Sequence, residues 1–132
     1  MKIVLASGVF DVLHYGHIKH LEYARKLGDR LVVGLTVDAH VNKGPKRPVF
    51  PDVMRKYVLE QLRCVSQVIL VDNSFMALHM VRPDIYVKGK EYEGKLLKGE
   101  KDFCKAHDIE IVFTDLPAYS TTKILNHESR SR

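Results

Sequence analysis

The sequence predicts an α/β fold in which helices cover both faces of one doubly wound sheet of five parallel strands. Two observations predict it. Strand-like apolar runs alternate five times with amphipathic stretches, a pattern typical of right-handed β-α-β crossovers. One run, residues 30–37, is apolar almost throughout, as expected of a strand that is buried on both faces. The length of 132 residues fits a single domain.

The first half of the chain begins with a strand at residues 2–7, which a glycine-containing turn connects to a helix at 17–27. Gly28-Asp29 ends that helix, and the strand at 30–37 follows. The next segment holds a glycine and three prolines, which exclude regular structure. Asp52 can then cap a helix that runs to about Cys64.

The second half repeats the alternation, with strands expected at 67–71, 84–88 and 109–113 and helices at 74–80 and about 96–107. Ser120-Thr121-Thr122 can cap a last short helix, about 122–127. We therefore expect one domain over residues 1–132, with a frayed tail at 127–132. Parallel sheets bind ligands at the carboxyl ends of their strands, so the functional residues are expected at that edge.

Composition and charge narrow the classes of function. No apolar run approaches the roughly 18 residues of a membrane helix, and no signal peptide is visible, so we expect a cytoplasmic protein without a membrane partner. Cys64 and Cys104 form no CxxC pattern and are expected to be reduced thiols. The net charge is +5, and cations without interleaved aromatics gather between residues 43 and 63. This pattern favours a polyphosphate pocket over a nucleic-acid surface.

The chemistry is expected in Gly8-Val9-Phe10-Asp11-Val12-Leu13-His14-Tyr15-Gly16-His17, between the first strand and the first helix. Gly8 leaves room for a phosphate near the backbone, and the helix that begins near Gly16 offers free N–H groups and a positive dipole end. His14 and His17 can each donate a hydrogen bond to a phosphate oxygen. Nucleotidyl transfer depends on such positioning and charge stabilisation, so the segment predicts a triphosphate site.

The pattern Gly8-x-Phe10-Asp11-x-x-His14-x-Gly16-His17 resembles the signature of the cytidylyltransferase-like nucleotidyltransferases, whose domain is Rossmann-like and of the HxGH type. The resemblance extends over nearly the whole chain. It implies that the two histidines bind the triphosphate and stabilise the transition state, and that Gly8, Val9, Phe10 and Gly16 border the nucleotide. Mg²⁺ is expected with the triphosphate, without a metal site built by the chain itself.

A second resemblance covers residues 43–49, which are similar to the basic loop of the family. It implies that Lys43 approaches a phosphate, and that Lys46 is a catalytic cation that offsets charge on the departing pyrophosphate. Arg55 and Arg63 stand at positions where relatives carry phosphate-binding or structural arginines.

Further segments complete the resemblance. Residues 82–92 are similar to a stretch that borders the base and ribose in relatives, which implies nucleotide contacts from Lys88 and Gly89. Tyr119-Ser120-Thr121-Thr122 resembles the family's carboxy-terminal motif, which implies a second phosphate-binding helix start. Asp11 either belongs to the acceptor side of the site or anchors the turn.

Two subfamilies compete for the substrate. The heptose 1-phosphate adenylyltransferase domain shares more segments with the chain, including Lys43-Gly44-Pro45-x-Arg47-Pro48-Val49. The favoured hypothesis is therefore formation of an ADP-sugar from ATP and a heptose 1-phosphate, with release of pyrophosphate. The alternative is a CTP-using enzyme acting on glycerol 3-phosphate or a similar phosphate, supported by Ser120-Thr121-Thr122-Lys123-Ile124. By analogy with relatives, a homodimer is expected, and no nucleic acid.

Departures from the family pattern keep a third hypothesis open, a nucleotide-binding module without turnover. Leu116-Pro117-Ala118-Tyr119 lacks the arginine that usually precedes the carboxy-terminal motif in the cytidylyltransferases. Ser66 stands where many relatives have an aspartate. A further departure, Lys90-Glu91-Tyr92 where the heptose relatives usually carry Gly-Asp-Tyr, leaves the base and the acceptor open.

Overall fold

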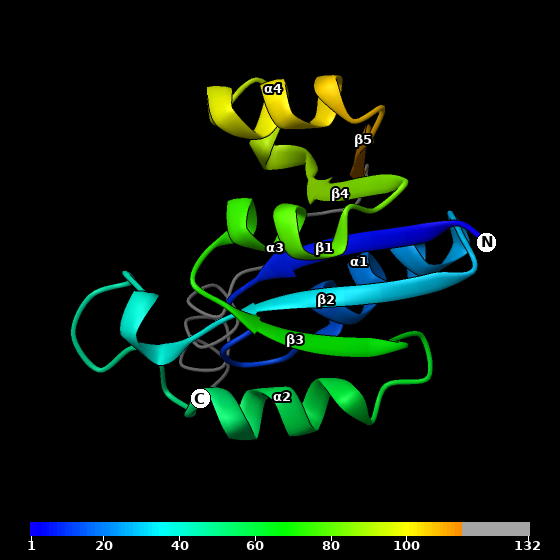
Figure 1. Cartoon of the computed structure of the whole chain (residues 1–132). Coiled ribbons are helices and arrows are strands. Elements are labelled where there is room, and N and C mark those ends of the chain that lie inside the picture. The colour runs from blue at the N-terminus through cyan, green and yellow to red at the C-terminus, as the bar shows by residue number, and fades with distance from the viewer. Residues whose placement is uncertain (115–132) are drawn as a thin grey trace.

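The computed structural model describes residues 1–114 and confirms the α/β fold (Figure 1). Its strands are β1 (Ile3–Gly8), β2 (Arg30–Thr36), β3 (Gln67–Val71), β4 (Ile85–Gly89) and β5 (Glu110–Thr114). Within these residues the α-helices are α1 (Tyr15–Lys26), α2 (Asp52–Glu60), α3 (Ser74–Val81) and α4 (Lys98–Ala106). Two 3₁₀ turns, η1 (Asp38–His40) and η2 (Lys90–Tyr92), follow β2 and β4. The expected helix at 122–127 and the expected tail lie outside the described residues.

All five strands are parallel and lie in the order β3-β2-β1-β4-β5. Figure 1 shows this order, from β3 at the bottom of the sheet to β5 at the top. The central strand β1 pairs with both β2 and β4, so that Val4 lies opposite Leu31 on one side and Ile85 on the other. The chain order reverses between β1 and β4, and the carboxyl ends of these two strands form the switch point where such sheets bind ligands.

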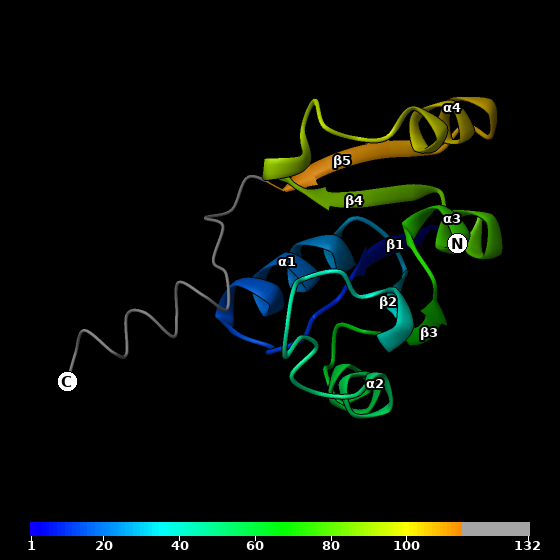
Figure 2. The ribbon, with the colours of Figure 1, turned by 90° about the vertical axis from the view of Figure 1, so that its left-hand side faces the viewer.

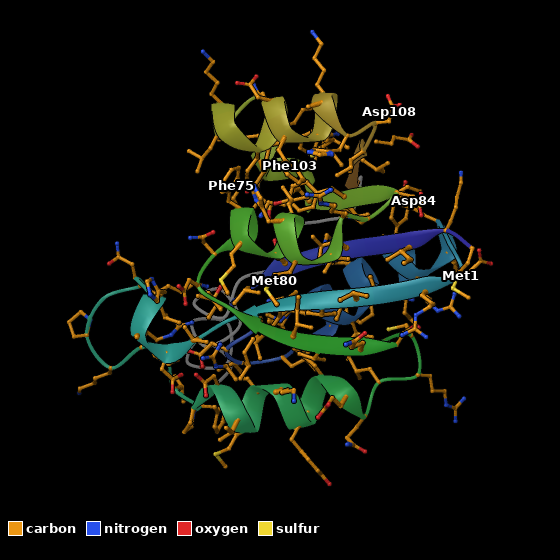
Figure 3. All side chains as sticks on the ribbon, in the orientation of Figure 1. Met1, Phe75, Met80, Asp84, Phe103 and Asp108 are labelled. Carbon is orange, nitrogen blue, oxygen red and sulfur yellow. The ribbon has the colours of Figure 1, made fainter. Side chains whose placement is uncertain are left out.

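Helices cover both faces of the sheet, as predicted. Figure 2 shows α1 on one side of the sheet and α3 and α4 on the other. Alternate residues of each strand point to opposite faces, so Val4 packs with Leu21 of α1 while Leu5 packs with Leu78 of α3. The side chains fill both interfaces, and Phe75 and Phe103 lie between α3 and α4 with ring centroids 6.1 Å apart (Figure 3). Each fully buried aliphatic side chain stabilises the fold by roughly 2 kcal/mol.

The expected boundaries of the second helix were wrong. Helix α2 ends at Glu60, four residues before Cys64, because the chain turns early to return to the sheet. The turn ends where the Ser66 N–H donates to the Leu31 carbonyl and the Ser66 hydroxyl accepts from the Leu31 N–H. Asp52 is not the cap either. It is the first helical residue, Pro51 holds the cap position, and the Asp52 carboxylate accepts from the Asp38 N–H at 3.0 Å.

Gly28 follows the first helix for a reason other than a left-handed cap. The cap residue, Leu27, has right-handed backbone angles, with φ −80° and ψ −12°. A Cβ atom on Gly28 would lie 2.8 Å from both the Lys2 carbonyl oxygen and the Val4 Cγ2 atom. The glycine is therefore required by the close approach of this turn to β1.

Both cysteines are free thiols, as predicted. Burial raises the pKa of Cys64, which lies in the turn after α2, and raises the pKa of Cys104 to about 11. Over residues 1–114, no helix combines the length and the apolar character needed to cross a membrane.

Candidate active site

The turn that follows β1 lies at the switch point and is tightly packed. Phe10 is only 8% exposed and adopts a left-handed φ of +47°. A Cβ atom on Gly8 would meet the Phe10 ring at 3.1 Å, so a larger residue at Gly8 would press on that ring. The Phe10 ring in turn contacts the His17 ring edge-on, with centroids 5.4 Å apart. The Phe10 ring, held in place by this turn, therefore packs against His17 and supports its position.

His14 and His17 cap the N-terminus of α1 with their own side chains. The His14 Nδ1 atom accepts from the Gly16 N–H at 3.1 Å, and the His17 Nδ1 atom accepts from the His14 N–H at 3.3 Å. The two rings stack with centroids 3.9 Å apart. Because both Nδ1 atoms accept, each neutral ring carries its proton on Nε2. The His14 Nε2 atom is buried and has no hydrogen-bond partner within the described structure.

Electrostatics keep both rings neutral near pH 7. Burial lowers the pKa of His14. Burial also lowers the pKa of His17, to about 4, with further contributions from His14, Lys43 and His20, while a hydrogen bond to the Val12 backbone opposes the shift. Neutral, stacked rings with Nε2–H groups are hydrogen-bond donors that suit phosphate oxygens.

The Asp11 carboxylate anchors the basic loop to this turn. It is buried and accepts from the Val49 N–H at 2.8 Å, the Phe50 N–H at 3.0 Å and the Arg47 Nε–H at 2.7 Å. Burial raises the pKa of Asp11, but these hydrogen bonds and the Arg47 cation outweigh burial and hold this pKa below its usual value. Of the two roles expected for Asp11, the geometry supports that of an anchor for the turn, because its oxygens already accept hydrogen bonds from three donors of the chain.

The anchored loop places Lys43 where its charge acts on His17. The Lys43 charge is among the causes of the low pKa of His17, and partial burial, together with the Arg47 cation, lowers the pKa of Lys43 itself. Lys46 lies in the same loop, is exposed, and has a left-handed φ of +63°. Among residues 1–114, no group of three or more His, Cys, Asp or Glu side chains is placed to hold a metal ion.

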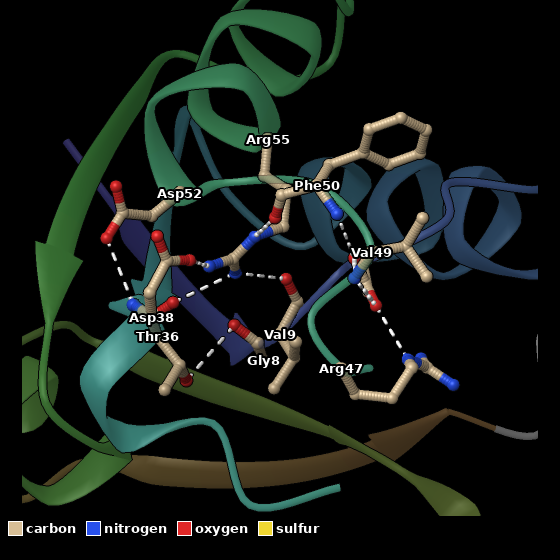
Figure 4. Close-up of polar contacts among 10 residues, drawn as sticks. Gly8, Val9, Thr36, Asp38, Arg47, Val49, Phe50, Asp52 and Arg55 are labelled. Carbon is tan, nitrogen blue, oxygen red and sulfur yellow. Dashed lines mark hydrogen bonds and ion pairs between the residues drawn. The ribbon is translucent and has the colours of Figure 1, made fainter. Parts of the chain in front are cut away.

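Of the two roles that the resemblance allows for Arg55, phosphate binding or a structural role, the geometry supports the structural one. Arg55 is 2% exposed, and four hydrogen bonds engage its guanidinium group within the chain (Figure 4). The acceptors are the carbonyls of Phe50, Val9 and Thr36, each at 2.9 Å, and the Asp38 carboxylate at 2.6 Å. Arg55 thus fixes the backbone of the motif turn at Val9 and ties it to β2 and to α2.

Arg63 was placed wrongly, because the helix that was expected to carry it ends at Glu60. It is exposed in the turn that leads into the amino end of β3. The motif turn lies at the carboxyl ends of the strands, so Arg63 stands at the opposite edge of the sheet from His14 and His17.

The carboxyl end of β4 holds the next pair of expected residues. Lys88 is partly buried, with its Nζ atom 5.7 Å from the Tyr86 ring centroid and 4.6 Å from that of Tyr92. A Cβ atom on Gly89 would lie 2.5 Å from the Glu91 carboxylate, which folds back over this glycine. Because β4 pairs in parallel with β1, both residues lie at the switch point, next to the end of β1.

The structure adds residues that the sequence analysis left without a role. The His20 Nδ1 atom lies 3.2 Å from the Thr114 Oγ1 atom, which joins α1 to the end of β5. Arg47 is the cation that pairs with Asp11. No local pattern indicates the contact of His20, because its partner Thr114 is 94 residues away in the chain. Tyr119, Ser120, Thr121 and Thr122 lie outside the described residues.

Comparisons with known proteins show the family of this chain. A family model described as Cytidylyltransferase-like matches residues 5–127. The chain is 38% identical over 128 residues to the Bifunctional protein HldE of Syntrophotalea carbinolica, a match that covers 93% of this chain and 26% of that protein. It is 40% identical over 129 residues to the Bifunctional protein HldE of Edwardsiella ictaluri, covering 95% of this chain and 27% of that protein. The chain thus spans about a quarter of the length of these curated relatives.

Solved structures also resemble this chain. A lipopolysaccharide core biosynthesis protein from Thermoplasma volcanium matches with a TM-score of 0.74 and 33% identity, over 91% of this chain and 99% of that one. Pantothenate synthetase from Thermus thermophilus matches with a TM-score of 0.60 and 14% identity, which shows a shared fold alone. The family model and the HldE relatives point to nucleotidyltransferase activity.

Proposed function

The chain belongs to the cytidylyltransferase-like family, as its motif predicted, and on that premise we propose that it joins a nucleoside monophosphate to a phosphorylated small molecule. The donor is a nucleoside triphosphate, and pyrophosphate is released. The favoured form of the reaction uses ATP and a heptose 1-phosphate and yields an ADP-sugar. The HldE relatives and the description of the Thermoplasma protein as a lipopolysaccharide core biosynthesis protein support this choice.

One observation carries the proposal: the His14 Nε2 atom is buried at the N-terminus of α1 and has no hydrogen-bond partner among residues 1–114. A buried donor left unpaired costs about 1–3 kcal/mol, which a bound acceptor group recovers. The helix dipole and the nearby Lys43 favour an anion at this place, and a triphosphate is the anion that the motif predicts.

The proposed step needs no covalent intermediate. An oxygen of the acceptor phosphate attacks the α-phosphorus in line, and the bond from this phosphorus to the bridging oxygen of the β-phosphate breaks. The electron pair leaves with pyrophosphate, and an ionised acceptor phosphate has no proton to lose. His14 and His17 donate to the phosphates, and Lys43 and Lys46 offset the charge that develops on the leaving group.

We propose that Mg²⁺ enters as part of the triphosphate substrate. The Asp11 carboxylate is occupied by three donors, and residues 1–114 offer no cluster of ligands for an ion. Triphosphate oxygens and water are ligands that Mg²⁺ accepts readily.

The test is pyrophosphate release in the presence of Mg²⁺, with ATP and CTP each crossed against heptose 1-phosphate, other sugar 1-phosphates and glycerol 3-phosphate. Turnover with ATP and a sugar 1-phosphate is expected. Turnover confined to CTP would move the chain to the cytidylyltransferase alternative. Nucleotide binding without turnover on any acceptor would favour the non-catalytic module. Arg63→Ala is the control variant, because it removes a cation from the edge of the sheet opposite the proposed site. It should release pyrophosphate at the wild-type rate.

Two further expectations accompany the proposal. By analogy with relatives we propose a homodimer, which light scattering coupled to gel filtration would test. We also propose that the enzyme acts in the cytoplasm, which cell fractionation with an antibody against the chain would test.

A further inference from the structure

A buried carboxylate lies on the face of the sheet opposite α1. Glu100 in α4 is only 4% exposed, although glutamate is rarely buried unless it is paired. Its Oε1 atom accepts a hydrogen bond from the Ser74 hydroxyl at the start of α3, and another from the Tyr86 hydroxyl of β4 at 3.2 Å. This one carboxylate therefore joins α4, α3 and the strand that leads to the switch point.

Lys88 stands next to this network. It follows Tyr86 by two residues and so shares its face of β4, and its Nζ atom lies 5.7 Å from the Tyr86 ring centroid. Burial lowers the pKa of Lys88, while the charges of Glu100 and Glu91 oppose that shift. A partly desolvated ammonium group is thus held by aromatic rings and stabilised by carboxylates.

Lys88 also lies at the edge of the sheet where the nucleotide site is expected. It lies at the carboxyl end of β4, beside the end of β1. Burial lowers the pKa of His20 in α1, the Lys88 charge lowers it further, and Glu91 opposes the shift. His20 in turn affects His17. The Lys88 charge therefore acts on His20 of α1, while its ammonium group lies over the Tyr86 ring of the buried network.

We infer that Glu100 is a positioning residue of the nucleotide site: the Tyr86 hydroxyl fixes its carboxylate beside β4, and the negative charge of this carboxylate holds the Lys88 ammonium at the carboxyl end of the strand. The inference rests on the proposed function, because Lys88 acts on a bound triphosphate. A lysine side chain loses much rotamer freedom when it is fixed, so a structure that holds it in place beforehand favours binding.

Replacement of Glu100 by glutamine separates this role from two simpler ones. Glutamine keeps an oxygen that accepts from Ser74 and Tyr86 and removes only the charge. If Glu100 were only a structural tie, nucleotide affinity would stay the same. If it were only a nearby negative charge, its removal would reduce repulsion of the triphosphate and tighten binding. A positioning role alone predicts weaker binding.

The experiment is calorimetric titration of the full chain with Mg-ATP and Mg-CTP, for the wild type, Glu100→Gln, Lys88→Met and the double variant. Each single substitution is expected to weaken binding about tenfold, and the double variant to bind no more weakly than Lys88→Met alone. Glu60→Gln, which removes an exposed charge on α2, is the matched control and is expected to leave affinity unchanged.

The outcomes distinguish this inference from the proposed function. Unchanged or tighter binding by Glu100→Gln, or additive losses in the double variant, would overturn the role of Glu100 and leave the proposed function intact. A wild type that binds neither nucleotide would overturn both. Should Glu100→Gln fail to fold, Tyr86→Phe takes its place, since it removes the hydroxyl link and is expected to weaken binding in a manner that depends on Lys88.

Discussion

Substitution of Asp11 by asparagine should release the basic loop from the motif turn. The asparagine keeps the size of the side chain but presents an amide where the carboxylate now accepts from Arg47, Val49 and Phe50. Hydrogen bonds to a buried charge contribute about 1.5–3 kcal/mol, and Arg47 would lose its anionic partner in addition. We therefore expect a loss of about 3 kcal/mol in the free energy of unfolding, or roughly 10 °C in Tm.

Thermal melting at several pH values and limited trypsin digestion measure this effect. The pKa of Asp11 is lower in the folded state than in the unfolded state. Its contribution to stability is therefore fully present above the unfolded pKa of about 3.9, and is lost as pH falls through the folded value. The difference in Tm between wild type and variant should persist at neutral pH and shrink in this acidic range. Trypsin should cut the released loop faster, after Lys43 and Lys46.

Asp29→Asn is the matched control, because Asp29 also accepts a backbone N–H, from Lys2 at 2.7 Å, but in an exposed position. It should change stability by less than about 1 kcal/mol. A variant at Asp11 that melts within about 2 °C of the wild type, with an unchanged rate of loop cleavage, would refute the anchoring role.

Three further predictions concern the residues around the motif turn. His17→Ala should lower kcat for pyrophosphate release about a hundredfold, because a transition-state donor is lost, and an unchanged rate would contradict the role of His17. Since burial holds the pKa of His17 near 4 in the folded protein, its contribution to stability is present above about pH 6.5 and lost as pH falls toward 4. Melting curves of His17→Gln over this range should show a shallower loss than those of the wild type, and equal slopes would count against the neutral ring. Arg55→Met should reduce the free energy of unfolding by about 3–5 kcal/mol in urea denaturation, because it leaves buried carbonyls and Asp38 without their donor, whereas a loss below about 1 kcal/mol would show that these contacts are dispensable.

Local patterns were enough to predict the sheet and the motif turn. Strand-like runs are short and apolar, and the expected strand at 67–71 coincides with β3. The spacing of His14 and His17 about Gly16 also specifies a local structure, because the two side chains cap the helix that begins between them. Such features depend on residues that are neighbours in the chain, so they can be predicted from the sequence alone.

The polar contacts that organise the site could not be predicted in the same way. Asp11 and Arg47 are 36 residues apart, and Arg55 and Val9 are 46 apart. A cation in an amphipathic helix is ordinarily solvated, so nothing in the helical pattern distinguishes the buried Arg55 from the exposed Arg63. The parallel order of the strands brings α2, which carries Arg55, beside the motif turn. It leaves the turn after α2, which carries Arg63, at the opposite edge of the sheet.

The same geometry weakens the hypothesis of a nucleotide-binding module without turnover. That hypothesis rested partly on Ser66, which replaces an aspartate common among relatives. Ser66 pairs with Leu31 through both its N–H and its hydroxyl, at the amino ends of β2 and β3. It therefore lies at the edge of the sheet opposite His14 and His17, away from the proposed triphosphate site. The remaining argument for a module without turnover comes from residues 116–119, which lie outside the described structure. The crossed substrate assay tests this argument directly, because such a module would bind nucleotide without releasing pyrophosphate.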